Sequence, residues 1–135
     1  MLPKWHILIS AIASIMLFFV GVSMPYVLVF FFSAFLIDFD HYLAFMIEKR
    51  SLNLKKAYDY FVELGKKCER GEIRGPLCIF HTVEFLIVFA VISYFNLVIF
   101  AILAGFVFHI SADVIHGLIT KTLKFRNFSI IGYLK

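Results

Sequence analysis

The sequence has few charged residues and a large excess of apolar ones. Only 16% of its 135 residues are charged, whereas 62% are hydrophobic and 18 are phenylalanine. A water-soluble domain of this length needs far more polar surface, so this composition excludes the soluble class and indicates an integral membrane protein. The length suffices for one compact unit, so we expect residues 1–135 to form a single membrane domain.

Cysteine is scarce, and several common functional motifs are missing. The two cysteines, Cys68 and Cys78, do not form a C-x-x-C pair, which excludes the commonest cysteine-based metal site. A cytosolic location would keep both thiols reduced, and the sequence alone assigns them no role. The chain also has no Gly-rich phosphate loop, internal repeat or low-complexity tract. The sequence therefore gives no indication of a nucleotide-binding protein or a repeat protein.

Four long apolar segments are present instead. They cover residues 5–22, 26–47, 76–95 and 97–119. Each has about 18 to 23 residues, enough for a helix rising ~1.5 Å per residue to cross a ~30 Å hydrocarbon core. Backbone groups in lipid must be satisfied internally, and none of the segments alternates like a membrane strand. The sequence therefore predicts an all-α integral membrane protein with a bundle of four transmembrane helices.

The basic residues set the orientation of these helices. All 13 lysines and arginines lie before the first segment, between the second and third segments, or after the fourth. The two other connections have none. By the positive-inside rule, both termini and the middle connection are cytoplasmic. We therefore expect a multi-pass protein of the inner (cytoplasmic) membrane.

The middle connection contains an amphipathic pattern over residues 52–70. Leu54, Tyr58 and Phe61 follow helical spacing, with charged residues on the other face. We expect a helix on the cytoplasmic surface, acting either as a lipid tether or as a lid over a site. The C-terminal residues 121–135 alternate basic and aromatic side chains. After a membrane helix, this pattern suits anionic headgroups better than RNA. We therefore expect membrane lipids, including anionic phospholipids, as partners, and no nucleic acid.

Ionisable side chains lie inside the apolar segments. An aspartate at the centre of a membrane helix costs about 2.5–3.5 kcal/mol, so such residues are functional candidates by default. The predicted topology places the candidates in the cytoplasmic half of the bilayer. They are Asp38, Asp40, His41, His81, Glu84, His109, Asp113 and His116. His6, near the start of the chain, fits the ordinary role of a histidine that hydrogen-bonds between helices.

The spacing of these candidates predicts a shared site. His109, Asp113 and His116 are four and then three residues apart, which places them on one stripe of one helix. The other two pairs each have i, i+3 spacing; they are Asp38 with His41 and His81 with Glu84.

Imidazoles and carboxylates together suit a divalent transition metal. We expect one or two ions, with Zn²⁺ as the first choice and Mn²⁺ or Fe²⁺ as the others. Asp40 points about 100° from His41 on a helix. It can serve a neighbouring metal, hold a histidine, or lie where the helix ends. Ion pairs that merely fix the bundle, or a proton pathway, are the rival interpretations.

Two of these motifs resemble those of a known family. The D-x-D-H at 38–41 and the G-x-x-x-H-x-x-x-D at 105–113 resemble motifs of the membrane-bound metal-dependent hydrolases described as LexA-binding inner-membrane proteins. The H-x-x-x-D element is also similar to that of zinc-dependent phospholipase C and the P1-type nucleases. The resemblance implies a helical metal-dependent hydrolase with ligands in both motifs. Residues 81–84 depart from it, because they lack the adjacent arginine and the second histidine, a position that Glu84 can fill.

The leading hypothesis is a hydrolase that cleaves an ester or phosphoester bond of a lipid headgroup at the cytoplasmic leaflet. In this interpretation Asp113 bridges the metals, Asp40 or Glu84 is the general base and His116 is the acid for the leaving group. A transporter of divalent cations or protons is an alternative, and it would require a homo-oligomer because four helices are few for a pore. A non-catalytic, metal-stapled membrane adaptor is a third possibility.

Overall fold

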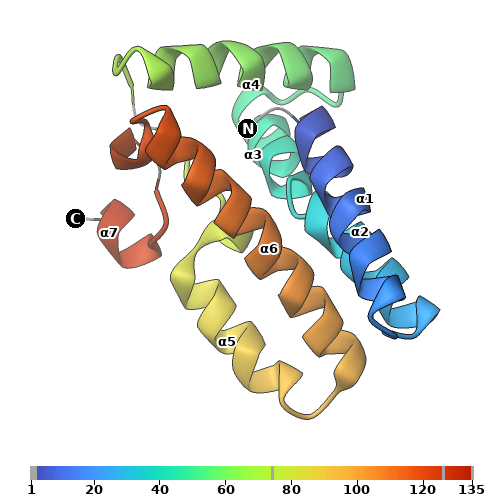
Figure 1. The fold of residues 1–135 in the computed structure, drawn as a ribbon. Helices are drawn as coiled ribbons and strands as arrows, with labels where there is room; N and C mark the ends of the chain where they lie inside the picture. Colours follow the sequence, from blue (N-terminus) through green and yellow to red (C-terminus); the bar gives the residue numbers. More distant parts are fainter. Residues whose placement is uncertain (1–2, 74, 126, 135) are drawn as a thin grey trace.

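The computed structural model describes residues 3–73, 75–125 and 127–134, and over these residues every regular element is helical (Figure 1). The prediction of an all-α chain is therefore confirmed. The elements in chain order are α1 (Pro3–Phe19), α2 (Met24–Leu36), α3 (Phe39–Lys49), α4 (Leu54–Glu69), the 3₁₀ turn Ile79–His81, α5 (Val83–Ser93), α6 (Leu97–Ile119), the 3₁₀ turn Leu123–Phe125 and α7 (Ile130–Leu134).

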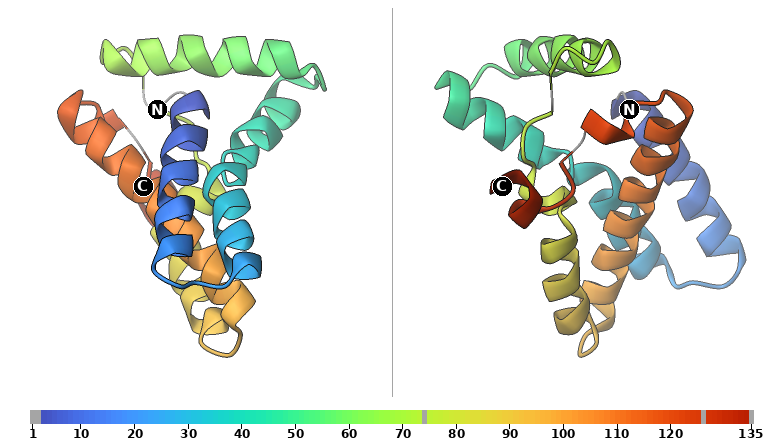
Figure 2. Two further views of the ribbon diagram at one scale, coloured as in Figure 1. Left: turned by 45° about the vertical axis from the view of Figure 1, so that its right-hand side comes forward. Right: turned by 90° about the vertical axis from the view of Figure 1, so that its left-hand side faces the viewer.

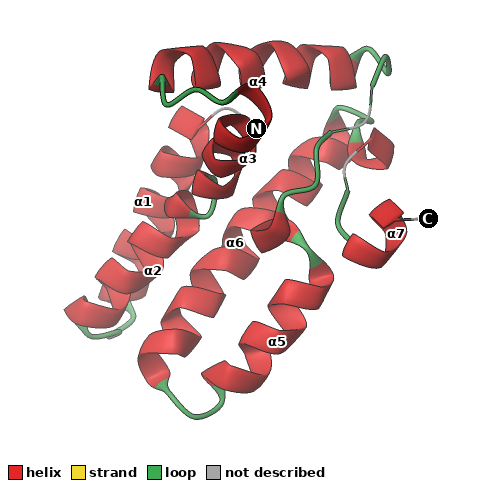
Figure 3. Cartoon of the chain, turned by 180° about the vertical axis from the view of Figure 1, so that it is seen from behind, coloured by secondary structure: helices red, strands yellow, loops and turns green. Residues whose placement is uncertain are grey.

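The long helices form a bundle with α4 across one of its ends (Figures 1 and 2). The loops from α1 to α2 and from α5 to α6 both lie at the end away from α4, as the view from behind makes clear (Figure 3). At the other end, α3 and α6 diverge toward α4 (Figure 2, left). Residues from the two hairpins and from α4 therefore meet at this one end.

Helices α2 and α6 pack closely because small residues face each other. A Cβ atom added at Gly105 would lie 2.1 Å from Ser33 Oγ and 2.7 Å from the carbonyl oxygen of Phe30. Ala34 is fully buried in this contact and Ala101 is nearly so. Such small residues allow helix backbones to approach in a membrane-type interface. The contact fixes the register of α6 against α2, and thereby the height of the residues that α6 presents at the α4 end.

Replacing Gly105 with alanine should destabilise the protein by about 1–3 kcal/mol, the usual effect of overpacking a tight contact. Thermal unfolding in detergent would measure this as a lower Tm. The matched control is Gly65→Ala in α4, where an added Cβ meets nothing within 4 Å. Alanine is the better helix former, so this control should leave the Tm unchanged or raise it. An unchanged Tm for Gly105→Ala would contradict the close α2–α6 packing.

The second apolar segment is not one uninterrupted helix. It is interrupted at Ile37 and Asp38, between α2 and α3, whereas the sequence predicts a continuous helix over residues 26–47. Asp38 is the N-cap residue of α3, a position that aspartate favours because its side chain competes with the helical backbone. Its carboxylate makes no cap hydrogen bond and is available for contacts with other helices.

The third apolar segment also differs from the expected helix over residues 76–95. Helix α5 has 11 residues, beginning at Val83, or about 16 Å of rise. Thr82 begins it, because its hydroxyl accepts a hydrogen bond from the Phe85 N–H at 3.3 Å. The residues before it form a turn, which His81 ends.

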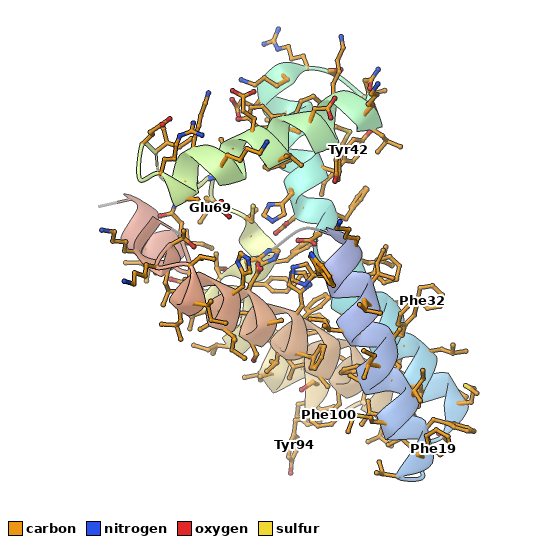
Figure 4. All side chains as sticks on the ribbon, turned by 45° about the horizontal axis from the view of Figure 1, so that its top comes forward. Phe19, Phe32, Tyr42, Glu69, Tyr94 and Phe100 are labelled. Carbon is orange, nitrogen blue, oxygen red and sulfur yellow. The ribbon has the colours of Figure 1, made fainter. Side chains whose placement is uncertain are left out.

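Two helical stretches are long and apolar enough to cross a membrane, judged by length and composition. They are Met24–Lys49, which includes the break at Asp38, and Leu97–Ile119. Less than half of each stretch is buried within the protein. Large apolar side chains project outward at the end away from α4: Phe19 and Phe95 are each 81% exposed. Figure 4 shows Phe19 and Phe32 pointing away from the bundle.

Candidate metal centre

Four separate parts of the chain place ionisable side chains together at the α4 end of the bundle. These parts are α1, the α2–α3 junction, the turn before α5, and α6. We call the group the His–Asp cluster. Its members are His6, Asp38, Asp40, His41, Cys78, His81, His109 and Asp113. Four overlapping trios within it have ligand atoms within 4.8 Å of one another, so these buried groups can hold a metal ion.

The carboxylate of Asp38 is central to the cluster. Its Oδ1 atom lies 3.4 Å from Nε2 of His41, 3.8 Å from Nε2 of His81 and 3.4 Å from Nε2 of His109. Charge-assisted N–H···O bonds are shorter, at about 2.7–2.9 Å. Two ligands of one tetrahedral zinc ion, each at about 2.1 Å, lie about 3.4 Å apart. The spacing therefore fits shared coordination better than simple ion pairing.

The tautomer of His109 is set by a backbone contact. Its Nδ1 lies 2.7 Å from the carbonyl oxygen of Ala34, which can only accept a hydrogen bond. Nδ1 therefore carries the proton, and in the neutral ring Nε2 carries a lone pair. This Nε2 is buried, has no hydrogen-bond partner among the described residues, and faces carboxylate oxygens of Asp38 and Asp113. A lone pair opposite two carboxylates is favourable when a cation lies between them.

His81 is oriented in the same way by a carboxylate. Its Nδ1 lies 3.0 Å from Oδ2 of Asp40, and that oxygen also accepts the Phe80 N–H at 3.1 Å. Nε2 of His81 is buried, has no hydrogen-bond partner in the described part of the chain, and faces Asp38. A ligating histidine that donates its other N–H to a carboxylate is a common arrangement in metal sites. Holding a histidine, one of the roles that the sequence leaves open for Asp40, is therefore supported by the contacts of its Oδ2 atom.

His6 belongs to the cluster, although the sequence did not predict it as a site residue. Its Nε2 lies 3.3 Å from Oδ1 of Asp113, and its ring stacks on that of His109 with centroids 3.8 Å apart. It does connect α1 to α6, as expected of a histidine between helices. It also brings a further imidazole nitrogen within reach of Asp38.

Cys78 is the second member that the sequence did not predict. Its sulfur lies 2.7 Å from Nδ1 of His41, and the residue is buried. Asp40 Oδ1 lies 3.8 Å from the same His41 nitrogen. The thiol therefore lies beside two predicted ligands, a position that a search for C-x-x-C spacing cannot detect.

Glu84 lies apart from the cluster. Its carboxylate accepts hydrogen bonds from the Ser129 hydroxyl at 2.6 Å and from the Ile130 and Ile131 N–H groups at 3.1 and 3.3 Å. It therefore caps α7. The i, i+3 spacing does not place His81 and Glu84 on one helix face, because α5 begins only at Val83. The expectation that Glu84 is a ligand or base is not supported by this position.

A cavity of about 850 Å³ lies over the cluster. Asp38, His41, His81 and Asp113 line it, as does His116, which is not part of any ligand trio. The opposite wall is the apolar face of α4. Its lining residues from that helix include Ala57, Tyr58, Phe61, Leu64 and Cys68. The cavity thus has a polar wall and an apolar wall.

Helix α4 is attached to the bundle through α3. The Tyr60 hydroxyl donates to Glu48 Oε2 at 2.9 Å, and the Tyr42 hydroxyl donates to the carbonyl of Leu52 at 2.8 Å. Partial burial and the hydrogen bond to Glu48 raise the pKa of Tyr60 to about 12, so its hydroxyl keeps the proton it donates. The ring of Phe61 lies 5.1 Å from that of His41, which brings α4 directly over the cluster.

The arrangement can bind a divalent cation through nitrogen and oxygen atoms beside a partly apolar cavity. Comparisons of the chain with protein families, curated proteins and solved structures found no match, so its function is inferred from this site.

Proposed function

We propose that this protein is a membrane-embedded, zinc-dependent hydrolase that cleaves an ester or phosphoester bond of a lipid headgroup at the cytoplasmic leaflet. One observation carries the proposal. The buried Nε2 atoms of His81 and His109 converge with the carboxylates of Asp38 and Asp113 at the wall of a cavity. The facing wall is apolar, as a lipid substrate requires.

The donor set fits zinc. Asp38, His81, His109 and Asp113 offer nitrogen and oxygen atoms in a buried place, and both histidines are oriented by hydrogen bonds from their second nitrogen. A zinc ion at such a site supplies an acidified water, with a pKa near 7, and polarises a carbonyl or phosphoryl oxygen. Proton transfer to the leaving group must then come from a side chain of the protein.

The role of the general acid is assigned by position. Glu84 caps α7, and Oδ2 of Asp40 is engaged with His81. His116 lines the cavity and follows Asp113 on α6 by three residues. We therefore assign His116 to donate the proton to the leaving group.

The outward faces of the helices support a membrane location. Tyr94 is 85% exposed, and Phe19 and Phe95 follow closely, all at the end away from α4. Exposed apolar surface of this extent is uncommon on soluble proteins but natural in lipid. We infer four crossings, formed by α1, by α2 with α3, by α5 with the preceding turn, and by α6. Non-helical backbone at membrane depth is tolerated where protein covers it, which suits the short α5.

The positive charge of α4 supports a site at the cytoplasmic leaflet. The exposed side of α4 carries Lys55, Lys56 and Lys66, and the last of these also lines the cavity. Basic residues at this depth attract anionic headgroups. The His–Asp cluster lies beneath α4, where the phosphate of a lipid that enters from the side would come within reach.

Metal removal tests the proposal. The purified protein should contain stoichiometric zinc and release product from labelled anionic phospholipid vesicles. A zinc chelator should abolish release, and added zinc should restore it, because the water-activating ion is lost and regained. Neutral vesicles serve as the comparison for headgroup charge. A protein without transition metal, or hydrolysis that survives chelation, would contradict the proposal, as would zinc uptake into proteoliposomes without hydrolysis.

A further inference from the structure

We propose that the cluster binds two zinc ions, and that the second is held through sulfur by Asp40, His41 and Cys78. This inference rests on the proposed function and deepens it. The first ion takes Asp38, His81, His109 and Asp113 as described above. The second subsite lies beside it, at the junction of α3 with the segment before α5.

The three side chains of the second subsite converge from two parts of the chain. Cys78 Sγ lies 2.7 Å from Nδ1 of His41, the distance of a hydrogen bond, and an ion held by both atoms would widen this separation to about 3.6 Å. Asp40 Oδ1 lies 3.8 Å from the same nitrogen, and the three ligand atoms lie within 4.8 Å of one another. Asp40 and Cys78 are each only 5% exposed. Asp40 Oδ1 is buried and has no hydrogen-bond partner among the described residues. A buried carboxylate oxygen without a donor is unfavourable unless a cation compensates it.

The two subsites are connected by contacts between the ligands of one and the ligands of the other. His81, which serves the first ion through Nε2, donates its Nδ1–H to Oδ2 of Asp40, a ligand of the second ion. His41, which serves the second ion through Nδ1, lies with Nε2 3.4 Å from Oδ1 of Asp38, a ligand of the first. Each histidine therefore has one nitrogen for a metal and the other for a carboxylate, as ligating histidines generally do. This arrangement uses every nitrogen of both rings.

The donor atoms identify the second ion as zinc. A thiolate is a soft ligand that disfavours magnesium, calcium and manganese, whereas sulfur, nitrogen and oxygen together suit zinc. The ion binds the thiolate, so the Cys78 S–H bond breaks and its proton passes to solvent. Three protein ligands leave a position open for substrate.

The presence of two ions also favours one of the two proposed substrate classes over the other. Asp38, His41, Cys78 and His81 all line the cavity, so both subsites face it. A phosphoester presents two oxygens that a pair of ions can stabilise together, whereas a carboxylic ester presents one carbonyl oxygen. The two-ion site therefore favours a phosphoester, such as that of a phospholipid headgroup.

X-ray absorption at the zinc edge tests the second subsite. The full chain is purified in detergent, loaded with Zn²⁺ alone and washed. We expect two zinc ions per chain and a zinc–sulfur distance of about 2.3 Å, with one sulfur for every two zinc ions. Cys78→Ser should lose one of the two ions and the sulfur signal, and keep the other ion.

Cys68→Ser is the matched control. Cys68 lines the same cavity from α4 but belongs to no ligand trio, so this variant should keep two zinc ions and the sulfur signal. The chain has only two cysteines, so a signal that survives in Cys68→Ser assigns the sulfur to Cys78 even if Cys78→Ser does not fold.

Three outcomes would overturn the inference. A single zinc ion without sulfur would remove the second subsite and leave the proposed hydrolase intact. A sulfur signal lost in Cys68→Ser would move the ligand to α4. A chain that binds no zinc would overturn both the second subsite and the proposed function.

Discussion

Replacing Asp38 with alanine should remove the first zinc ion and reduce lipid hydrolysis to background. Oδ1 of Asp38 lies within 3.8 Å of the Nε2 atoms of His41, His81 and His109. Removing it takes away the carboxylate oxygen that faces all three of these Nε2 atoms. Loss of a group that merely orients a ligand lowers metal affinity about 10–100-fold, so loss of this ligand should exceed that range.

Metal analysis after dialysis against a weak chelator measures this effect, with vesicle hydrolysis as the second readout. Asp59→Ala is the matched control, because Asp59 is exposed on α4 and away from the cluster; it should keep both zinc and activity. His109→Ala and Asp113→Ala should resemble Asp38→Ala. Full zinc content in Asp38→Ala would show that Asp38 is not a metal ligand.

Replacing Phe61 with alanine should weaken the use of long-chain lipid substrates about 10-fold or more while the metal stays bound. Phe61 lines the cavity from α4, and its ring lies 5.1 Å from that of His41. Full burial of a phenylalanine side chain is worth about 1.5–3 kcal/mol, and each 1.4 kcal/mol is a factor of ten in affinity. The loss should appear in KM for lipids, because the variant removes contact area and leaves every metal ligand in place.

A short, water-soluble phosphoester provides the internal comparison for Phe61→Ala, because it has no chain to place against α4. Its hydrolysis should change less than that of the lipid. Phe19→Ala makes the same substitution at the end away from α4, where the side chain is 81% exposed, and should leave both substrates unaffected. Equal losses on both substrates would show that α4 supports the site without contacting the lipid.

The parts of the fold that sequence predicted best are those set by local periodicity. Helix α6 spans Leu97–Ile119, the residues expected for the fourth apolar segment, and it brings His109 and Asp113 to one face. Helix α4, at Leu54–Glu69, follows the amphipathic pattern of residues 52–70. In both cases 3.6-residue spacing decides which side chains share a face, so one segment contains all the information required.

The errors arose where local backbone structure overrides that periodicity. The pairing of His81 with Glu84 assumed one continuous helix, but the Thr82 hydroxyl starts α5 between them. His81 consequently turns toward α3, and Glu84 turns toward α7. The four transmembrane crossings remain a prediction, because among the described residues two helical stretches, and not four, have the length and composition to span a membrane.

His6 and Cys78 escaped prediction for a different reason. Each contacts residues far away along the chain: His6 meets Asp113, and Cys78 meets His41. Neither residue belongs to a spaced motif, so the helix packing alone brings them into the cluster. A lone histidine in an apolar helix is ordinarily a packing residue, and only the position of its partner distinguishes the two roles.

The contact between His6 and Asp113 has a consequence for the order in which the protein is made. Helix α1 is synthesised first, and the α2–α3 junction brings Asp38 and Asp40 long before α6 exists. An aspartate at the centre of a membrane helix costs about 2.5–3.5 kcal/mol during insertion, so in the proposed membrane location both carboxylates need partners. Their imidazole partners His81 and His109 are synthesised later, and His6 finds Asp113 only once α6 is in place. A chain that stops before α6 therefore lacks His109 and Asp113, two of the four residues proposed to hold the first ion, so loading of that ion depends on completion of the chain.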